Sequence, residues 1–145
     1  APMIVPLFPY SEVEFIRAEA EWKAGNNTGA KTAYEKAVKA AMEQWTVTMP
    51  ADYFTNTFAA YNGTLERILL QKYYSQVFVD YQQWFEYRRT GFPTLPVAAG
   101  MLNNGVMPSR FMYPISVKVS NPDKYNEAVT GMGGDNINVK VWWEK

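Results

Sequence analysis

The sequence predicts an all-α protein, with a helical hairpin near its N-terminus, further helices and an irregular C-terminal region. Three long stretches repeat apolar residues at the helical spacing of three and four positions. No stretch shows the sustained alternation of apolar and polar residues that a half-buried β-strand requires. A chain of 145 residues with 48% hydrophobic content can bury a substantial core. We therefore expect one domain over residues 1–145.

The first predicted helix begins at Ser11 and runs to about residue 24. Ser11 is followed three residues later by Glu14, the pattern of a capping box, in which both side chains satisfy backbone amides at the helix start. Apolar residues form two rows along this helix. One row is Val13, Ile16 and Ala20, and the other is Phe15, Ala18 and Trp22.

A neighbouring helix can cover only one of these rows, and we expect the row of Phe15, Ala18 and Trp22 to form an exposed apolar patch. The segment PMIVPLF, residues 2–8, adds apolar side chains that have no local partner. Such a patch exceeds what a soluble monomer usually exposes. The chain is therefore expected to self-associate, or to be stabilised by a segment that precedes it.

The second predicted helix begins at Thr28, after the stop signal Gly25-Asn26-Asn27, and runs to Trp45. Its apolar positions keep the helical spacing throughout: Ala30, Ala33, Tyr34, Ala37, Val38, Ala41, Met42 and Trp45. Two helices joined by so short a turn pack antiparallel. The spacing of Ala30, Tyr34 and Ala37 is typical of the second helix of a tetratricopeptide repeat. An ordinary helical hairpin is the alternative.

The middle of the chain is expected to hold a connection and two further helices. Residues 46–63 form the connection, with one short helix after Pro50. Thr64 caps a third helix that ends near Phe78, and a short fourth helix runs from Asp80 to Thr90. The apolar face of the third helix consists of Leu65, Ile68, Leu69, Tyr73 and Val77.

Two adjacent arginines close the fourth helix, within the stretch QQWFEYRRTGFPTLP. Such a cluster can be a polyanion site, a sugar-stacking platform or the end of a helix. Gly91 is the left-handed residue expected just past a helix, and Pro93 forbids continuation. Arg88 and Arg89 then lie in the last turn, where positive charge complements the helix dipole. We therefore predict a structural role for Arg88, Arg89 and Gly91.

The C-terminal region has weaker periodicity. Residues 95–106 read as a loop, and residues 107–120, MPSRFMYPISVKVS, read as extended chain interrupted by proline. Asn121-Pro122-Asp123 is a strong helix start, with a cap residue, proline in the first turn and an acid beside it. This helix is expected to end at Val129. A glycine-rich loop and an apolar tail complete the chain.

The composition excludes several classes of chemistry. The chain has 14 basic and 14 acidic residues, so no net charge favours nucleic acid. It has no Cys and no His, which removes disulfides, thiol nucleophiles, Ser-His-Asp triads and the commonest transition-metal ligand. Residues Asp123, Asp135 and Asn136 lack the spacing of a calcium loop. We expect no catalytic residues, no metal and no cofactor.

Four blocks in order resemble the SusD/RagB family, in particular its SusD-like nutrient-binding outer-membrane lipoproteins. The blocks are SEVEFIRAEAEWKAG, QQWFEYRRTGFPTL, MPSRFMYPISVKVSNPDKYNEAV and GGDNINVKVWW. The matching positions are Ala18, Glu19 and Ala20 in the first block, Trp84 and Arg88 to Gly91 in the second, and Arg110, Tyr113, Pro114, Asn121 and Pro122 in the third.

This resemblance implies a mostly helical protein that sits on the cell surface at the outer membrane, held by an N-terminal lipid anchor outside these residues. It implies a SusC-like TonB-dependent transporter as the partner, and an oligosaccharide or another nutrient as the ligand, captured without cleavage. It also implies that residues 1–145 are the C-terminal helical part of a larger protein.

Two functions from different classes remain open, with an enzyme as a third. The first is nutrient capture, for which the candidate ligand contacts are Tyr53, Phe54 and Tyr61. These aromatics lie in the irregular connection, where side chains are not committed to a helix face. The second is a tetratricopeptide-like module that binds a protein segment. A single hairpin disfavours it, because such repeats usually need three or more units.

Overall fold

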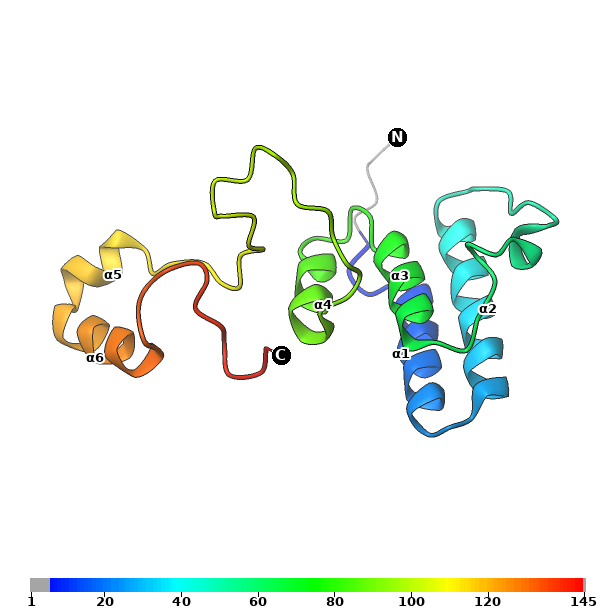
Figure 1. The fold of residues 1–145 in the computed structure, drawn as a ribbon, viewed down its shortest axis with the longest axis horizontal. Helices are drawn as coiled ribbons and strands as arrows, with labels where there is room; N and C mark the ends of the chain where they lie inside the picture. The colour runs from blue at the N-terminus through cyan, green and yellow to red at the C-terminus, as the bar shows by residue number, and fades with distance from the viewer. Residues whose placement is uncertain (1–5, 145) are drawn as a thin grey trace. The chain divides into compact units, whose positions relative to one another are not determined.

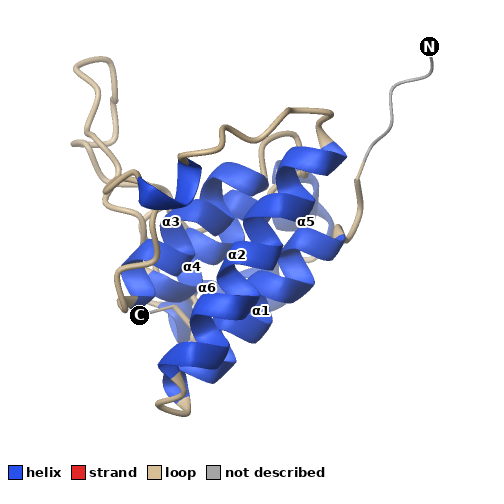
Figure 2. Cartoon of the chain, turned by 90° about the vertical axis from the view of Figure 1, so that its right-hand side faces the viewer, coloured by secondary structure: helices blue, strands red, loops and turns tan. Residues whose placement is uncertain are grey.

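Residues 6–144 are described by a computed structural model, and throughout that range the regular structure is helical, with no strand (Figure 2). The all-α prediction is confirmed. The elements are α1 Tyr10–Lys23, α2 Asn27–Gln44, the short 3₁₀ helix η1 Tyr53–Thr55, α3 Leu65–Ser75, α4 Gln82–Thr90, α5 Ile115–Ser120 and α6 Pro122–Met132 (Figure 1). The chain divides into two compact units. Unit 1 comprises residues 1–87 and 91–94, and unit 2 comprises residues 88–90 and 95–145.

Unit 1 is built on the hairpin of α1 and α2, which lie side by side and are joined by a three-residue turn (Figure 1). Helix α1 packs mainly on α2 and, to a lesser extent, on α3. Small residues such as Ala33 and Ala37 are fully buried, which lets the helices approach closely. The core consists of Phe15, Ala18, Ala33, Tyr34, Ala37, Val38 and Ile68.

The apolar row that faces solvent is the opposite of the one predicted. Phe15 and Ala18 are fully buried, and the half-buried Trp22 donates its indole N–H to the carbonyl oxygen of Gly63 at 2.8 Å. The prediction of an exposed patch around these three residues is therefore wrong, because α2, α3 and the chain before α3 cover that row. The exposed row is the one with Val13 and Ile16. Of the apolar segment 2–8, residues 2–5 lie outside the described range.

Two predicted helix starts also differ from the structure. Helix α1 begins one residue before Ser11, because the carbonyl oxygen of Pro9 already accepts the first amide bonds of the helix. Ser11 is buried and caps nothing, and Glu14 accepts a hydrogen bond from the Tyr10 hydroxyl at 2.7 Å instead. Helix α2 is capped by Asn26 rather than Thr28, since the Asn26 side chain accepts from an amide of the first turn.

The later helix boundaries agree more closely with the sequence. Thr64 caps α3 as predicted, accepting from the amide of Arg67 at 3.2 Å. Asn121 likewise caps α6, which has proline in its first turn and continues past Val129 to Met132. Residues 107–120 are not simply extended, because Ile115–Ser120 forms helix α5. The alternating apolar residues of ISVKVS concealed that helix, which begins directly after Pro114.

A buried polar cluster joins α1, α3 and α4 in unit 1. Lys72 of α3 lies 3.1 Å from a carboxylate oxygen of Glu86 on α4. Gln76 of α3 donates to a carboxylate oxygen of Glu12 on α1 at 3.3 Å. Burial raises the pKa of Glu12, the positive charge of Lys72 opposes this effect, and the negative charge of Glu86 adds to it. Ionised Glu12 is thus destabilising in the folded protein.

Replacing Glu12 with Gln is expected to stabilise the protein at neutral pH. A raised carboxyl pKa contributes stability below the unfolded-state pKa, and that contribution is lost as the pH rises through the folded-state value. The advantage of Glu12→Gln should therefore be small in acid and grow toward neutrality. Urea unfolding of both proteins across this pH range measures it, with the exposed Glu43→Gln as control. An advantage that shrinks as the pH rises would contradict this assignment.

Unit 2 is organised around the carboxylate of Asp135, which the sequence analysis considered only as a calcium ligand. One oxygen lies 3.4 Å from the guanidinium of Arg110 and accepts from the amide of Tyr113 at 3.2 Å. The other oxygen accepts from the Tyr125 hydroxyl at 3.1 Å. The Arg110 guanidinium also lies over the Tyr113 ring, 4.9 Å from its centre. Polar contacts therefore tie the segment before α5 to α6 and to the loop that follows.

Candidate functional site

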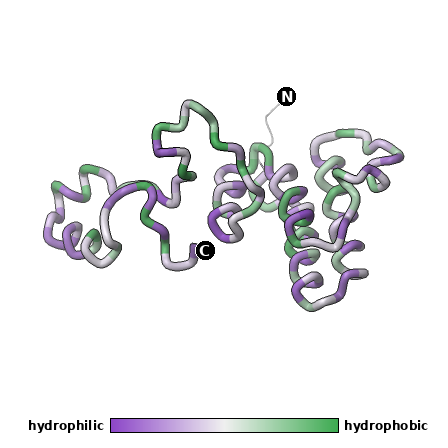
Figure 3. The backbone as a smooth tube through the Cα atoms, in the orientation of Figure 1, coloured by the Kyte–Doolittle hydropathy of each residue, from purple (hydrophilic) through white to green (hydrophobic). Residues whose placement is uncertain are grey.

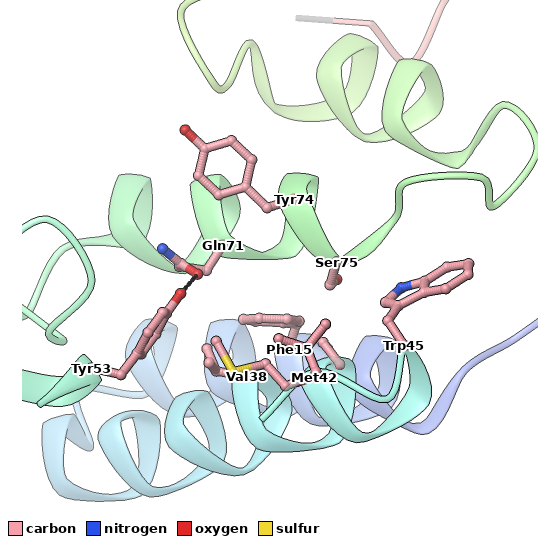
Figure 4. A pocket seen from close by; sticks show the side chains of 10 residues that line it. Phe15, Val38, Met42, Trp45, Tyr53, Gln71, Tyr74 and Ser75 are labelled. Atoms are coloured by element: carbon pink, nitrogen blue, oxygen red, sulfur yellow. Dashed lines mark hydrogen bonds between the residues drawn. The ribbon is translucent and has the colours of Figure 1, made fainter. Parts of the chain in front are cut away.

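A pocket of about 240 Å³ opens in unit 1 among the residues of α1, α2 and α3 and the chain around η1 (Figure 4). Its lining is mostly apolar or aromatic, which is typical of small-ligand sites. The residues that line it are Phe15, Val38, Ala41, Met42, Trp45, Val47, Tyr53, Gln71, Tyr74 and Ser75.

The pocket has an apolar base and a polar end. Figure 4 shows Phe15, Val38 and Met42 grouped along one side, with Trp45 and Tyr53 at opposite ends. The Tyr53 hydroxyl donates to the side-chain oxygen of Gln71 at 2.9 Å. Burial raises the pKa of Tyr53, so its hydroxyl stays protonated at neutral pH. The pocket can therefore offer aromatic faces and a few hydrogen-bonding groups to a ligand.

The structure brings together two of the three aromatics proposed from sequence. Tyr53 lines the pocket, and Phe54 packs edge-on against it with ring centres 5.5 Å apart. The ammonium of Lys39 lies 5.8 Å from the centre of the Phe54 ring. Tyr61 is not part of the pocket lining. Its ring packs on Tyr34 at 5.6 Å, and its hydroxyl donates to a side chain at the start of α2.

The sequence analysis missed other aromatics that are better exposed. Trp45 borders the pocket and packs edge-on against Phe78, with ring centres 6.2 Å apart. Tyr74 on α3 is exposed at the pocket. Phe58, in the same connection as Tyr53, is 83% exposed. Trp45 was assigned to the apolar row of the second helix. Its position at the end of the helix was the sequence signal against that assignment, because a side chain there can point away from the packed helix face.

Arg88 has partners in the C-terminal tail. It is only 8% exposed, and its Nε lies 3.8 Å from a carboxylate oxygen of Glu144. Its guanidinium lies 4.4 Å from the centre of the Trp143 ring. Arg89 is half-buried, and the helix ends at Gly91 with φ of 75° in the left-handed region. The structural role of Arg88, Arg89 and Gly91 stays a prediction.

Two further features bear on the class of site. Within residues 6–144, no group of three or more acidic side chains gathers in a way that could hold a metal ion. No helix in the part of the chain that the structure describes has the length and apolar character needed to cross a membrane.

Comparison with known proteins gives one family and several solved structures. The family described as "SusD-like: starch-binding associating with outer membrane" matches residues 1–114. The Bacteroidetes AC2a SusD-like protein has 27% identity and a TM-score of 0.80, covering 94% of this chain. A chitin-binding protein has 29% identity and a TM-score of 0.76 over 93%. No curated protein sequence matches the chain.

A further solved structure is a chitin-binding SusD homolog from Flavobacterium johnsoniae, with 26% identity and a TM-score of 0.76 over 92% of this chain. In each of these three structures the matched region is a minor part, 30%, 32% and 35% of the solved chain respectively. The chain therefore spans about a third of their length. Because the family match covers most of the sequence, this chain belongs to the SusD-like family, as its four sequence blocks predicted.

Proposed function

We propose that the protein captures an oligosaccharide at the outer membrane without cleaving it, and delivers it to a SusC-like TonB-dependent transporter. The observation that carries this proposal is the family match, whose description names starch binding and association with the outer membrane. Two of the structurally similar proteins are chitin-binding. The ligand class is therefore a glycan, and the polypeptide is lipid-anchored at the cell surface by sequence outside residues 1–145.

The chemistry of the described residues supports binding rather than catalysis. Cleavage of a glycosidic bond usually needs two carboxyl groups on either side of the bond, spaced for an acid and a nucleophile or base. The pocket lining contains no acidic residue and only a few hydrogen-bonding side chains. Aromatic faces can pack on the C–H faces of a sugar ring and exclude water from it. We assign Tyr53 and Phe54 to this role at the pocket, and Tyr61 to a separate contact.

Replacing Tyr53 with Ala is expected to weaken oligosaccharide binding severalfold. The variant removes an aromatic face and the hydroxyl that bonds to Gln71. Isothermal titration with a linear chitin oligosaccharide and a linear starch oligosaccharide measures the effect, and Phe54→Ala and Tyr61→Ala complete the series. Circular dichroism of each variant checks that the fold is intact.

Phe58→Ala is the matched control, because Phe58 lies in the same connection but outside the pocket lining. The proposal expects it to bind as the parent does. If Phe58→Ala loses binding while the Tyr53, Phe54 and Tyr61 variants keep it, the glycan contacts an exposed aromatic platform and our site assignment is wrong. If the parent binds neither oligosaccharide, the ligand site lies outside these residues.

A further inference from the structure

A buried acid and a buried amide meet between α1 and α3 in unit 1, and each has one oxygen without a partner. Hydrophilic and hydrophobic positions are intermixed along both helices (Figure 3). Glu12 and Gln76 are two of the hydrophilic positions that are buried, at 5% and 0% exposure. Gln76 Nε2 donates to Glu12 Oε1 at 3.3 Å. The other carboxyl oxygen, Glu12 Oε2, and the amide oxygen, Gln76 Oε1, have no hydrogen-bond partner among the described residues.

The two unpaired oxygens cannot satisfy each other while Glu12 is ionised, because a carboxylate and an amide oxygen only accept hydrogen bonds. Buried oxygens without a partner are rare in proteins, since each has lost its hydrogen bonds to water. The two oxygens belong to the same carboxyl and amide groups that the existing bond brings into contact. One proton on Glu12 Oε2 can therefore satisfy both: the O–H group donates to Gln76 Oε1, while Gln76 Nε2 continues to donate to Glu12 Oε1.

We propose that Glu12 is a buried proton-binding site, and that its protonated carboxyl group forms a reciprocal acid–amide pair with Gln76 that joins α1 to α3. When the proton leaves, the carboxylate keeps only the bond from Gln76 Nε2, and the pair loses its second hydrogen bond. The pair lies beside the pocket, because Ser75, next to Gln76, and Phe15, one turn after Glu12, both line it. The proton thus controls the contact between two helices of the pocket wall, with or without a bound glycan.

The groups around Glu12 set the pH at which the pair loses its proton. Burial raises the pKa of Glu12, and the negative charge of Glu86 on α4 adds to this effect. The positive charge of Lys72 on α3 and the bond from Gln76 oppose it. A carboxyl group with a raised pKa stabilises the fold below its unfolded-state pKa, and this contribution is lost as the pH rises through the folded-state value. The reciprocal pair is therefore complete in acid and loses its second bond above the folded-state pKa of Glu12.

Carbon-13 NMR of the side-chain carbonyl groups tests the pair directly. In the parent protein, the Glu12 carboxyl signal and the Gln76 amide signal should shift with one common midpoint as the pH is raised. In Glu12→Gln, the Gln76 signal should lose this transition, because an amide donates at every pH. Gln71 is the internal control, since its oxygen accepts from the Tyr53 hydroxyl and its signal should not follow Glu12. A Gln76 signal that stays fixed while Glu12 titrates would overturn the proposal, because water would then satisfy the two oxygens.

Thermal unfolding in acid separates the pair from the effect of burial alone. Glu12→Gln should unfold at nearly the same temperature as the parent, because its amide can make both hydrogen bonds of the protonated acid. Glu12→Met fills a similar space but leaves the Gln76 amide buried and unpaired, so it should unfold several degrees lower. If Glu12→Met is as stable in acid as Glu12→Gln, the position needs only a neutral side chain, and the proposed pair is overturned.

Discussion

Replacing Lys72 with Met is expected to lower the free energy of unfolding by about 3–5 kcal/mol, the usual cost of breaking a buried ion pair from one side. The Lys72 side chain is 2% exposed and lies 3.1 Å from Glu86. Its charge also acts favourably on the buried Glu12. Without Lys72, two carboxylates remain close together in a poorly hydrated site at the junction of three helices. Urea unfolding at neutral pH measures the loss.

Two further variants distinguish the effect of burying an ion pair from the effect of ion pairing itself. The pair of Lys124 and Glu127 has a shorter N–O distance, 2.6 Å, but both side chains are at least 70% exposed. Lys124→Met should therefore cost less than about 1 kcal/mol. The double variant Lys72→Met with Glu86→Leu should recover much of the stability, because it removes one of the two carboxylates on which the Lys72 charge acts. Similar losses for Lys72→Met and Lys124→Met would show that the Lys72 cluster is hydrated rather than buried.

Replacing Phe15 with Ala is expected to cost about 3–5 kcal/mol, as for other large aromatic side chains in a close-packed core. Phe15 is fully buried, and its ring packs edge-on against Tyr34 with centres 6.2 Å apart. It also lines the pocket, so its removal should enlarge that cavity. The variant is therefore expected to lose ligand binding as well as stability.

The neighbouring residue supplies the control for Phe15. Ile16 is 44% exposed on the other side of α1, and Ile16→Ala should change stability by only about 0.5 kcal/mol. Denaturant unfolding of the two variants thus measures which face of α1 is buried. A larger loss for Ile16→Ala than for Phe15→Ala would mean that α1 is turned the other way, as the sequence pattern suggested.

Sequence periodicity predicted the helices well, because long amphipathic stretches, a Thr cap and an Asn-Pro start are local signals. It failed on the orientation of α1, where both rows are apolar and the exposed one carries the more hydrophobic Val13 and Ile16. Orientation there depends on how α1 packs on both α2 and α3, and α3 comes from a distant part of the sequence. The buried Glu12 and Lys72 were invisible for the same reason, since charged residues normally indicate a solvated face.

The candidate site was only partly predictable. Tyr53 could be chosen because it lies in an irregular segment, and the structure places it in the pocket lining. Trp45 and Phe78 could not be chosen from the sequence, because the contact between their rings depends on how the chain leaves α2 and α3. Phe78 has a positive φ of 61° just past α3, a conformation that periodicity does not reveal. The contact of Arg88 with Trp143 likewise joins distant parts of the sequence.

The most direct test of the account is a single incubation that measures both binding and turnover. The protein is mixed with a chitin or starch oligosaccharide of defined length, the bound fraction is determined by equilibrium dialysis, and the recovered sugar is sized by mass spectrometry. A capture protein of the SusD-like family should show saturable binding and return the oligosaccharide at its original length. Shortened products that disappear when one carboxylate is replaced would contradict the account, because they would identify an enzyme rather than a capture protein.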